Sequence, residues 1–546
     1  MNNLRRQLPA ALLLSFTFTT FATTHYVDMN STNAMPPYTS WTTAANVIQD
    51  AVDAAATGDE IIVTNGIYAT GGRAMYGTMT NRVAITKPLT LMSVNGPEFT
   101  IIQGYQVPGT IRGDGAIRCV YLTNAAVLVG FTLTNGATRT SGDQSAEQSG
   151  AGIWCEPGAT VSNCVIAGNV ASSHSGGVYR GILNDCTIAD NSANIGGGAC
   201  FSTLVNCALT ANSATLGGGN CGGTLSNCTL SNNSASNQGG GTDGGILNYC
   251  TLLGNWGYYG GGAYNATLNN CSLKGNRANR SGGGVQRGTL NNCTLSGNSA
   301  NGGGAAYDAT LNNCTVVGNS GNMAAGGVYY GNYRNCIIYF NTNGNHMSAA
   351  LKWCCATPLP SSGIGNITNA PLFLDQVAEN FRLQSNSPCI NSGWNAYSAG
   401  EADLGGHPRI VGGTVDLGAY EFQSPASTLS YAWLQRFGLP TDGSLDFLDP
   451  DFDSHNNWQE WRADTVPTNA FSRLSLAIPT NTSNGLALTW QSLATRTYFL
   501  ERGTNLSDIP AFLTLASDIL GQPGTTTFTD TTATNGGPFF YRVGVE

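Results

Sequence analysis

The chain is poor in charge: only 10% of its 546 residues are Asp, Glu, Lys or Arg, and the formal net charge is −9. Because no basic stripe is present to neutralise phosphates, a nucleic-acid partner is not expected. No apolar run of about 18 residues or more follows the N-terminus, so no membrane-spanning helix is expected either. Glycine is abundant instead, at 71 residues, and this favours a fold with many tight turns. The length indicates several modules rather than one core.

Residues 1–22 are predicted to be a secretion signal. Arg5 and Arg6 form a basic region, residues 8–21 supply an apolar stretch, and Ala22 offers a small residue for cleavage. The alternative is a disordered or anchoring segment, but the apolar run is short for a membrane span. We therefore expect an extracellular or cell-surface protein.

Nine cysteines recur through the middle of the chain at intervals of 21 or 22 residues. They are Cys164, Cys186, Cys207, Cys228, Cys250, Cys271, Cys293, Cys314 and Cys336. An asparagine stands five residues after each: Asn169, Asn191, Asn212, Asn233, Asn255, Asn276, Asn298, Asn319 and Asn341. A period held to within one residue marks a solenoid in which each repeat stacks on its neighbours.

Each repeat passes from a glycine triplet through Thr-Leu-x-Asn-Cys-Thr-Leu to Asn-Ser-Ala. Three short β-prone runs separated by Gly or Asn corners predict one coil of a right-handed parallel β-helix, a mainly β fold. The Cys-x-Leu alternation places the cysteine column inside, as small, reduced, buried side chains. Any disulfides are expected among the other seven cysteines, which are Cys119, Cys155, Cys200, Cys221, Cys354, Cys355 and Cys389.

The asparagine column is expected to be a structural ladder at a corner of the coil. Each amide can hydrogen-bond the next, and asparagine tolerates the left-handed backbone that a sharp bend requires. Upstream, Phe131 takes the cysteine place in an earlier coil, and residues 137–149 form an irregular polar loop. Apolar residues at helical spacing in residues 47–55 predict a short amphipathic helix that covers the open N-terminal end.

Three segments resemble known families. Residues 41–68, with Ile-Gln-Asp-Ala-Val and Gly-Asp-x-Ile-x-Val, resemble the N-terminal cap of pectate-lyase-like β-helix proteins. The Gly-Gly-Gly and Asn-Ser-Ala repeats resemble those of the polymorphic outer-membrane adhesin family. Residues 365–422 are similar to the choice-of-anchor Q domain through the segments 387–391, 403–409 and 415–421. This last resemblance implies a bacterial surface or secreted protein and carries no known reaction.

No catalytic residues are predicted. A β-helix lyase needs a cation or positive group beside a Lys or Arg base, and a hydrolase needs paired carboxylates. Neither set is evident. The favoured function is a non-catalytic glycan-binding or adhesion role. Two alternatives stay open, an extracellular polysaccharide lyase or glycoside hydrolase and a purely structural surface or matrix protein.

A mixed aromatic and polar column follows the last glycine of each repeat by two positions. Alternation places this column outside, because Asp243 and Gln286 would be costly to bury unpaired. The predicted substrate-binding residues are Trp154, Tyr179, Tyr264 and Tyr329. They would stack the rings of a polysaccharide or cell-surface glycan; the alternative is that they pack on one another across coils. We expect a monomer.

Residues 426–466 are predicted to hold a Ca²⁺ loop between helices at 431–437 and 458–462. Counted from Asp449, oxygen ligands fall at positions 1, 3, 5, 7, 9 and 12, the spacing of a twelve-residue Ca²⁺ loop. The ligands are Asp449, Asp451, Asp453, the main-chain carbonyl of His455, Asn457 and Glu460. Ser454 stands where such loops normally have glycine. The segment resembles dockerin and thrombospondin type 3 modules; the alternative is an acidic linker.

The remaining domain boundaries are predicted from changes in the sequence pattern along the chain. The β-helix is predicted to span 25–364, with the anchor-like segment 365–422 at its end. Residues 471–546 contain short alternating strands, with a tryptophan in an early one, and are similar to a fibronectin type III sandwich.

Overall fold

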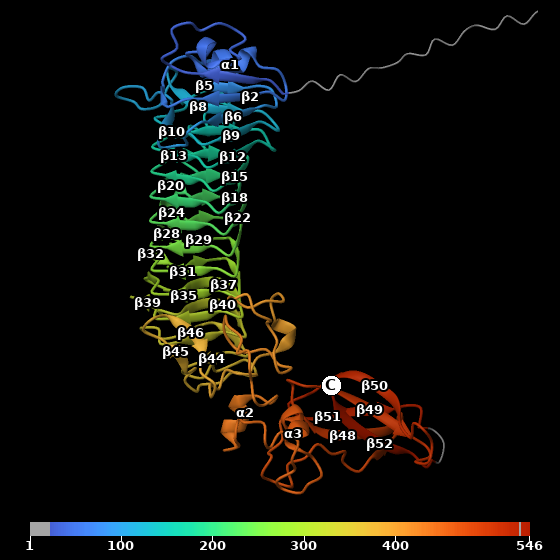
Figure 1. Ribbon diagram of the computed structural model, residues 1–546. Helices are drawn as coiled ribbons and strands as arrows, with labels where there is room; N and C mark the ends of the chain where they lie inside the picture. The colour runs from blue at the N-terminus through green and yellow to red at the C-terminus, as the bar shows by residue number, and fades with distance from the viewer. Residues whose placement is uncertain (1–21, 534–536) are drawn as a thin grey trace, which may run out of the picture.

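The structure is a computed structural model and describes residues 22–533 and 537–546. The predicted secretion signal, apart from Ala22, lies outside these residues. Figure 1 shows a long stack of coils, followed by two short helices and a terminal β unit beside its lower end. Within the described ranges, no helix is long and apolar enough to cross a membrane.

The stack is a right-handed parallel β-helix, as predicted. One face is a 13-stranded parallel sheet with one strand from each coil. Its strands are β3 (Gly66–Tyr68), β7 (Thr100–Gln103), β10 (Thr132–Thr134), β13 (Val165–Ala167), β16 (Thr187–Ala189), β19 (Ala208–Thr210), β23 (Thr229–Ser231), β27 (Thr251–Leu253), β31 (Ser272–Lys274), β35 (Thr294–Ser296), β38 (Thr315–Val317), β41 (Ile337–Tyr339) and β44 (Cys355–Ala356). A six-stranded sheet comprises β20 (Ser213–Leu216), β24 (Ser234–Gln238), β28 (Trp256–Tyr259), β32 (Arg277–Ser281), β36 (Ser299–Ala300) and β39 (Ser320–Gly321).

A 25-stranded sheet forms the remaining surface and contains two neighbouring columns of strands. The first column is β5 (Thr80–Ile85), β8 (Ile117–Leu122), β11 (Ile153–Cys155), β14 (Val178–Tyr179), β17 (Ala199–Cys200), β21 (Asn220–Cys221), β25 (Thr242–Asp243), β29 (Ala263–Tyr264), β33 (Val285–Gln286), β37 (Ala306–Asn312), β40 (Val328–Arg334) and β42 (His346–Met347). The second is β1 (Thr24–Val27), β2 (Glu60–Val63), β6 (Thr90–Ser93), β9 (Val127–Val129), β12 (Thr160–Ser162), β15 (Ile182–Asn184), β18 (Thr203–Val205), β22 (Thr224–Ser226), β26 (Ile246–Asn248), β30 (Thr267–Asn269), β34 (Thr289–Asn291), the later parts of β37 and β40, and β43 (Ala350–Lys352). β4 (Arg73–Ala74) pairs antiparallel with β5.

A short helix covers the N-terminal end of the stack, as the apolar spacing predicts. It is α1 (Ile48–Ala54), which buries Ile48, Ala51 and Val52. The side chain of Gln49 is also buried, and its Oε1 accepts from the backbone N–H of Ala84 at 2.7 Å. A 3₁₀ turn at Trp41–Thr43 precedes this helix.

The cysteine column is buried, as predicted, and its members contact one another through hydrogen bonds. The backbone N–H of Cys207 donates to Sγ of Cys228 at 3.4 Å, and the Cys228 thiol faces the carbonyl oxygens of Leu204 and Ser226. Phe131 takes the cysteine place in an earlier coil, as predicted, because its backbone N–H donates to Sγ of Cys164 in the same way. At the other end, Cys354 repeats the bonding of Cys336. Assigning Cys354 outside the column is therefore wrong; its shorter interval of 18 residues hides it in the sequence.

All sixteen cysteines lie in the described part of the chain, and none is bridged there. The expectation that disulfides form among the cysteines outside the column is therefore not met.

The asparagine column is a buried ladder that joins successive coils. In the middle of the stack, Oδ1 of Asn255 accepts from both the backbone N–H and the Nδ2 of Asn233, each at 3.0 Å. The Nδ2 of Asn255 donates in turn to the carbonyl of Leu230 at 2.8 Å. Each amide therefore pairs a backbone N–H and a backbone carbonyl of the preceding coil, and so joins that coil to its own.

The ladder asparagines do not themselves adopt the left-handed backbone, which corrects the sequence expectation. The residue before each rung does so, for example Asn232 with φ of 53° and Gly254 with φ of 62°.

The glycine triplets allow close packing between coils. A Cβ on Gly241 would lie 2.5 Å from the carbonyl oxygen of Gly262 in the next coil, so no side chain fits there.

The chain after the last coil packs beneath the open C-terminal end. It contains the hairpin β45 (Phe373–Asp375) and β46 (Asn380–Leu383), a 3₁₀ turn at Asn395–Tyr397, and the helices α2 (Tyr431–Arg436) and α3 (Asn457–Ala463). The terminal unit holds two antiparallel sheets of three strands each. These are β47 (Thr480–Thr482), β48 (Gly485–Ser492) and β51 (Gly524–Asp530), and β50 (Leu513–Leu520), β49 (Thr497–Gly503) and β52 (Phe540–Val545). Leu488, Trp490, Tyr498 and Leu500 form its core.

Replacing a central rung of the asparagine ladder should destabilise the β-helix strongly. Asn255→Ala removes the acceptor of the Asn233 N–H and the donor to Leu230, which leaves buried groups unpaired. We expect a loss of about 2–4 kcal/mol in the free energy of unfolding, measured by urea denaturation. Asn269→Ala is the matched control, because Asn269 belongs to a part-buried outer ladder in which it bonds Asn248 at 2.9 Å. Equal losses in the two variants would contradict this role.

The cysteine column should be closed to reagents in the native protein. Thiol titration should detect its members only after unfolding, because Cys250 is 1% exposed and its neighbours are similarly buried. Cys250→Ala should cost about 1 kcal/mol, through a small cavity rather than through a lost bridge. Fast labelling of native Cys228 or Cys250 would contradict the observed packing.

Candidate functional site

The mixed aromatic and polar column is in continuous register along the 25-stranded sheet. Trp154 pairs with Tyr179 in the next coil, and Tyr179 pairs with Cys200. Farther along, Asp243 pairs with Tyr264, and Tyr264 with Gln286. The column predicted from glycine spacing is therefore a physical row of side chains, but its two halves differ in exposure.

The first half is covered, so the expectation that Trp154 and Tyr179 are exposed is wrong. Trp154 is 5% exposed and Tyr179 is 4% exposed. The Trp154 ring stacks on Tyr121 with centroids 5.4 Å apart and contacts Tyr76 at 5.5 Å. For these two residues the structure shows the alternative, packing on neighbouring rings across coils.

The irregular loop at 137–149 supplies the cover. The indole N–H of Trp154 donates to the carbonyl of Ser145 at 2.9 Å, and the hydroxyls of Tyr179 and Ser145 lie 3.0 Å apart. Buried Arg118 holds the end of this loop through bonds to the carbonyls of Ala146 and Ser149. The loop is thus fixed over the column by groups that the repeat pattern does not contain.

The second half presents a patch that we call the tyrosine surface: Tyr264, Tyr307, Tyr329 and Tyr330, with Arg287. Tyr264, Tyr307 and Tyr329 are half-buried, and Tyr330 is 42% exposed. Tyr307 meets Tyr329 edge-on at 5.4 Å, and Tyr329 stacks on Tyr330 at 4.2 Å. Arg287 donates to the Tyr264 hydroxyl at 3.1 Å and pairs with Asp308 at 3.5 Å. Tyr307, Tyr329 and Tyr330 therefore contact one another on the sheet, and Tyr264 lies two coils before Tyr307, bonded to Arg287.

Sequence reasoning missed Tyr307 and Tyr330. In the coil of Tyr307, Ala305 stands where the neighbouring coil has Gly284, so counting from the last glycine stops one residue short. Pairing with Tyr329 places Tyr307 in the column. Tyr330 has a left-handed backbone with φ of 55°, and alternation alone gives no signal for it.

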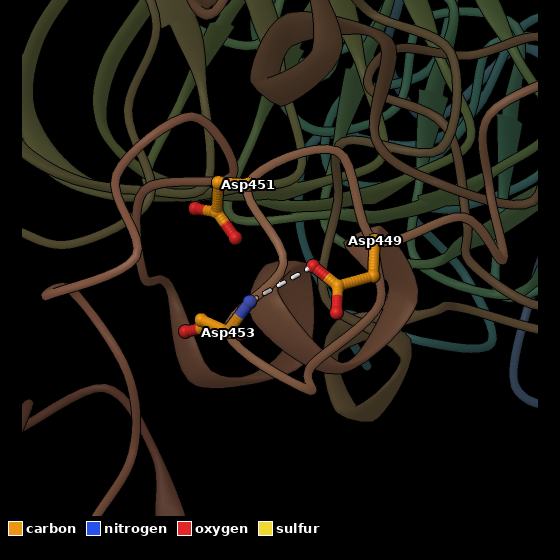
Figure 2. Close-up of side chains that lie close together, drawn as sticks. All are labelled: Asp449, Asp451 and Asp453. Atoms are coloured by element: carbon orange, nitrogen blue, oxygen red, sulfur yellow. Dashed lines mark hydrogen bonds between the residues drawn. The ribbon is translucent and has the colours of Figure 1, made fainter.

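The acidic loop holds its three aspartates together, as its spacing predicts. Among the described residues, Asp449, Asp451 and Asp453 are the group whose carboxylate oxygens could share one ion, all within 4.8 Å of one another. Figure 2 shows these side chains around a common space. Asp449 accepts from the backbone N–H groups of Asp453 and Ser454, at 3.2 and 2.9 Å. Ser454 has φ of 75°, so it makes the turn usually assigned to glycine.

Five of the side-chain oxygens around this space lack hydrogen-bond donors. Buried and unpartnered among the described atoms are both carboxylate oxygens of Asp451, Oδ2 of Asp453, Oδ1 of Asn457 and Oε2 of Glu460. Asn457 donates its Nδ2 to the carbonyl of Leu445, which leaves its oxygen as the free end. Buried acceptors without donors are costly unless a cation satisfies them.

Helix α3 brings Glu460 to the loop. A capping box at Asn456 and Gln459 begins the helix, which sets Glu460 on its first turn, 1% exposed. Burial, and then the charges of Asp451 and Asp453, raise the pKa of Glu460 to about 7. His455 donates its backbone N–H to Asp453 at 2.8 Å. Hard oxygen ligands with surplus negative charge suit Ca²⁺ better than zinc.

Strand pairing defines the molecule as a mainly β protein built on a parallel β-helix. A scan against protein-family models finds no match, and a search of curated proteins finds none. The family resemblances of the separate segments therefore remain predictions.

Solved structures that match this chain include a pectate lyase, a mannuronan C-5 epimerase module and a polygalacturonase. Pectate lyase Pel9A is 14% identical over 73% of this chain and 96% of that chain, with a TM-score of 0.33. The A-module of Azotobacter vinelandii mannuronan C-5 epimerase AlgE6 is 14% identical over 60% and 95%, with a TM-score of 0.32. Polygalacturonase from Erwinia carotovora ssp. carotovora is 10% identical over 63% and 94%, with a TM-score of 0.27. At these values the likeness concerns the fold and carries no argument about activity.

Proposed function

We propose that this protein is an extracellular or cell-surface β-helix protein that binds a polysaccharide or cell-surface glycan without turnover. The observation that carries the proposal is the tyrosine surface, where aromatic rings of successive coils lie in register and half-exposed on a rigid sheet. Because aromatic faces are apolar and the phenols can hydrogen-bond, such a row suits sugar rings.

The spacing of the surface suits an extended chain. Tyr264 and Tyr329 are separated by three coil steps, which is roughly 14 Å at about 4.8 Å per step. Rings held by backbone pairing lose little entropy when a ligand binds. Arg287 adds donors at the middle of the row.

The acids beside this surface support binding rather than hydrolysis. Asp243 and Asp308 lie three coil steps apart, roughly 14 Å of rise. Paired carboxylates of glycoside hydrolases stand only about 5–9.5 Å apart. Asp308 is paired with Arg287, and burial raises the pKa of Asp243 to about 6.

Removing rings from the tyrosine surface should weaken glycan binding. Tyr329→Ala, alone or with Tyr307→Ala, should lower affinity about five- to tenfold per ring on a panel of immobilised polysaccharides, because stacking area is lost. Tyr249→Ala is the matched control, since Tyr249 is 59% exposed on another part of the helix.

A turnover assay on soluble polysaccharides tests the enzymatic alternative. Ultraviolet absorbance should show no unsaturated product when the protein is incubated with pectin, alginate or glycosaminoglycans. Turnover of any of them would replace the binding proposal with a lyase. Binding that is equal in all the tyrosine variants would remove the proposed surface.

The proposal includes one Ca²⁺ in the acidic loop. Asp449, Asp451, Asp453, the carbonyl of His455, Asn457 and Glu460 would hold it. The unpartnered oxygens support this assignment. Bound calcium would neutralise the carboxylates and order the segment between the β-helix and the terminal sheets.

Calcium should bind the full chain and raise its stability by mass action. Calorimetry and melting curves with added Ca²⁺ should show heat and a higher Tm, and chelator should reverse both. Glu460→Gln should weaken binding most, because it removes the closing charge, whereas Ser454→Gly should strengthen it by about tenfold, through relief of about 1–2 kcal/mol of left-handed strain. Asp508→Asn, an exposed acid outside the loop, is the control. If millimolar Ca²⁺ gives neither heat nor a Tm shift, the loop is only an acidic linker.

A further inference from the structure

A large cavity lies where the end of the β-helix, the two short helices and the terminal sheets meet. Its volume is about 960 Å³, and its walls come from residues 353–369, 391–414, 430–464 and 495–497 and from Glu546. Figure 1 shows α2 and α3 at this junction, between the last coils and the terminal strands. The volume lies near the upper end of the roughly 300–1,000 Å³ typical of small-molecule sites.

Four tryptophans line the cavity: Trp353, Trp394, Trp433 and Trp461. Trp353 and Trp394 stack with centroids 5.4 Å apart and an interplanar angle of 18°. They come from the last coil and from the segment beneath it, so the tertiary fold rather than the repeat creates the pair. Flat aromatic walls of this kind match the apolar faces of sugar rings.

Three arginines line the same cavity without acidic partners. Arg436, Arg462 and Arg496 are wall residues, and none of them is in a salt bridge within the described chain. The wall carboxylates Asp464 and Glu546 are exposed. Unpaired guanidinium groups beside a cavity are ready to bind carboxylate in a bidentate manner.

Arg496 links all three parts of the junction. It lies in the terminal unit, donates from Nη2 to the carbonyl of Trp461 at 3.2 Å, and places its guanidinium carbon 6.0 Å from the centre of the Trp353 ring. Its Nε is buried and has no hydrogen-bond partner among the described atoms, and the same holds for the indole nitrogen of Trp433. Both groups are hydrogen-bond donors only, so a ligand that satisfies them must supply hydrogen-bond acceptors.

We propose that this cavity binds an acidic saccharide, whose sugar rings lie on the tryptophan walls and whose carboxylates meet the arginines. A neutral apolar ligand would leave the buried donors unpaired, and an inorganic anion would leave the aromatic walls unused. The site is separate from the tyrosine surface and from the calcium loop. The cavity combines aromatic walls with unpaired arginines, whereas the arginine of the tyrosine surface, Arg287, is paired with Asp308.

Calorimetry on the full chain with trigalacturonate tests the proposal, and its fully methyl-esterified form serves as the uncharged analogue for comparison. Wild-type protein should bind the acid and should bind the ester at least about tenfold more weakly, because charge-assisted bonds are lost. Arg496→Gln and Arg436→Gln should each weaken trigalacturonate at least about fivefold. Arg473→Gln, an exposed arginine outside the cavity, should leave binding unchanged.

The outcomes separate this site from the tyrosine surface. Tyr329→Ala should not change trigalacturonate binding, so loss in that variant with none in the arginine variants would overturn the cavity site. Equal binding of acid and ester, or no binding of either, would also overturn it. Because Arg496 is half-buried, its variant is first compared with wild type by melting temperature; Arg436 is exposed and carries the test if Arg496→Gln is unstable.

Discussion

Register between coils is the constraint on which the β-helix depends. The backbone pairs each strand with the same position of the next coil, and the asparagine ladder bonds the corner where strand pairing is interrupted. A buried amide has few ways to satisfy both its donor and its acceptor, so a slip of one residue would leave a column of unpaired groups. The ladder therefore enforces the register that the hydrophobic core alone would leave looser.

The same constraint explains why surface chemistry occurs in rows. Once coils are in register, a side chain at one position lies over its equivalent in the next coil, and Tyr307 meets Tyr329 for this reason. A row is nevertheless open only where nothing crosses it. The 137–149 loop crosses the first half of the column and takes the hydrogen bond of Trp154, whereas the tyrosine surface stays accessible.

The C-terminal end differs from the stack of coils, because it concentrates charged side chains, which are rare in the coils. The coils carry few charges, but the segment after them gathers acids in the acidic loop and arginines around the junction cavity. Helix α3 connects the two: Glu460 faces the acidic loop, and the carbonyl of the adjacent Trp461 accepts from Arg496. Ordering of the acidic loop would therefore also position one wall of the cavity.

The sequence alone determined the features that repeat or that follow a fixed ligand spacing. The 21- or 22-residue interval predicts the β-helix and the buried cysteines, the apolar spacing at 47–55 predicts α1, and the acidic spacing groups Asp449, Asp451 and Asp453. These are local or periodic signals, which need no knowledge of distant neighbours.

Only the tertiary structure decided which side chains stay exposed or meet across modules. The 137–149 loop buries Trp154, a shortened interval hides Cys354, and Ala305 displaces Tyr307 from the glycine count. Trp353, Trp394 and Arg496 come together from segments far apart in the chain. Such contacts depend on how non-repeating segments pack on the stack, and no period in the sequence encodes that packing.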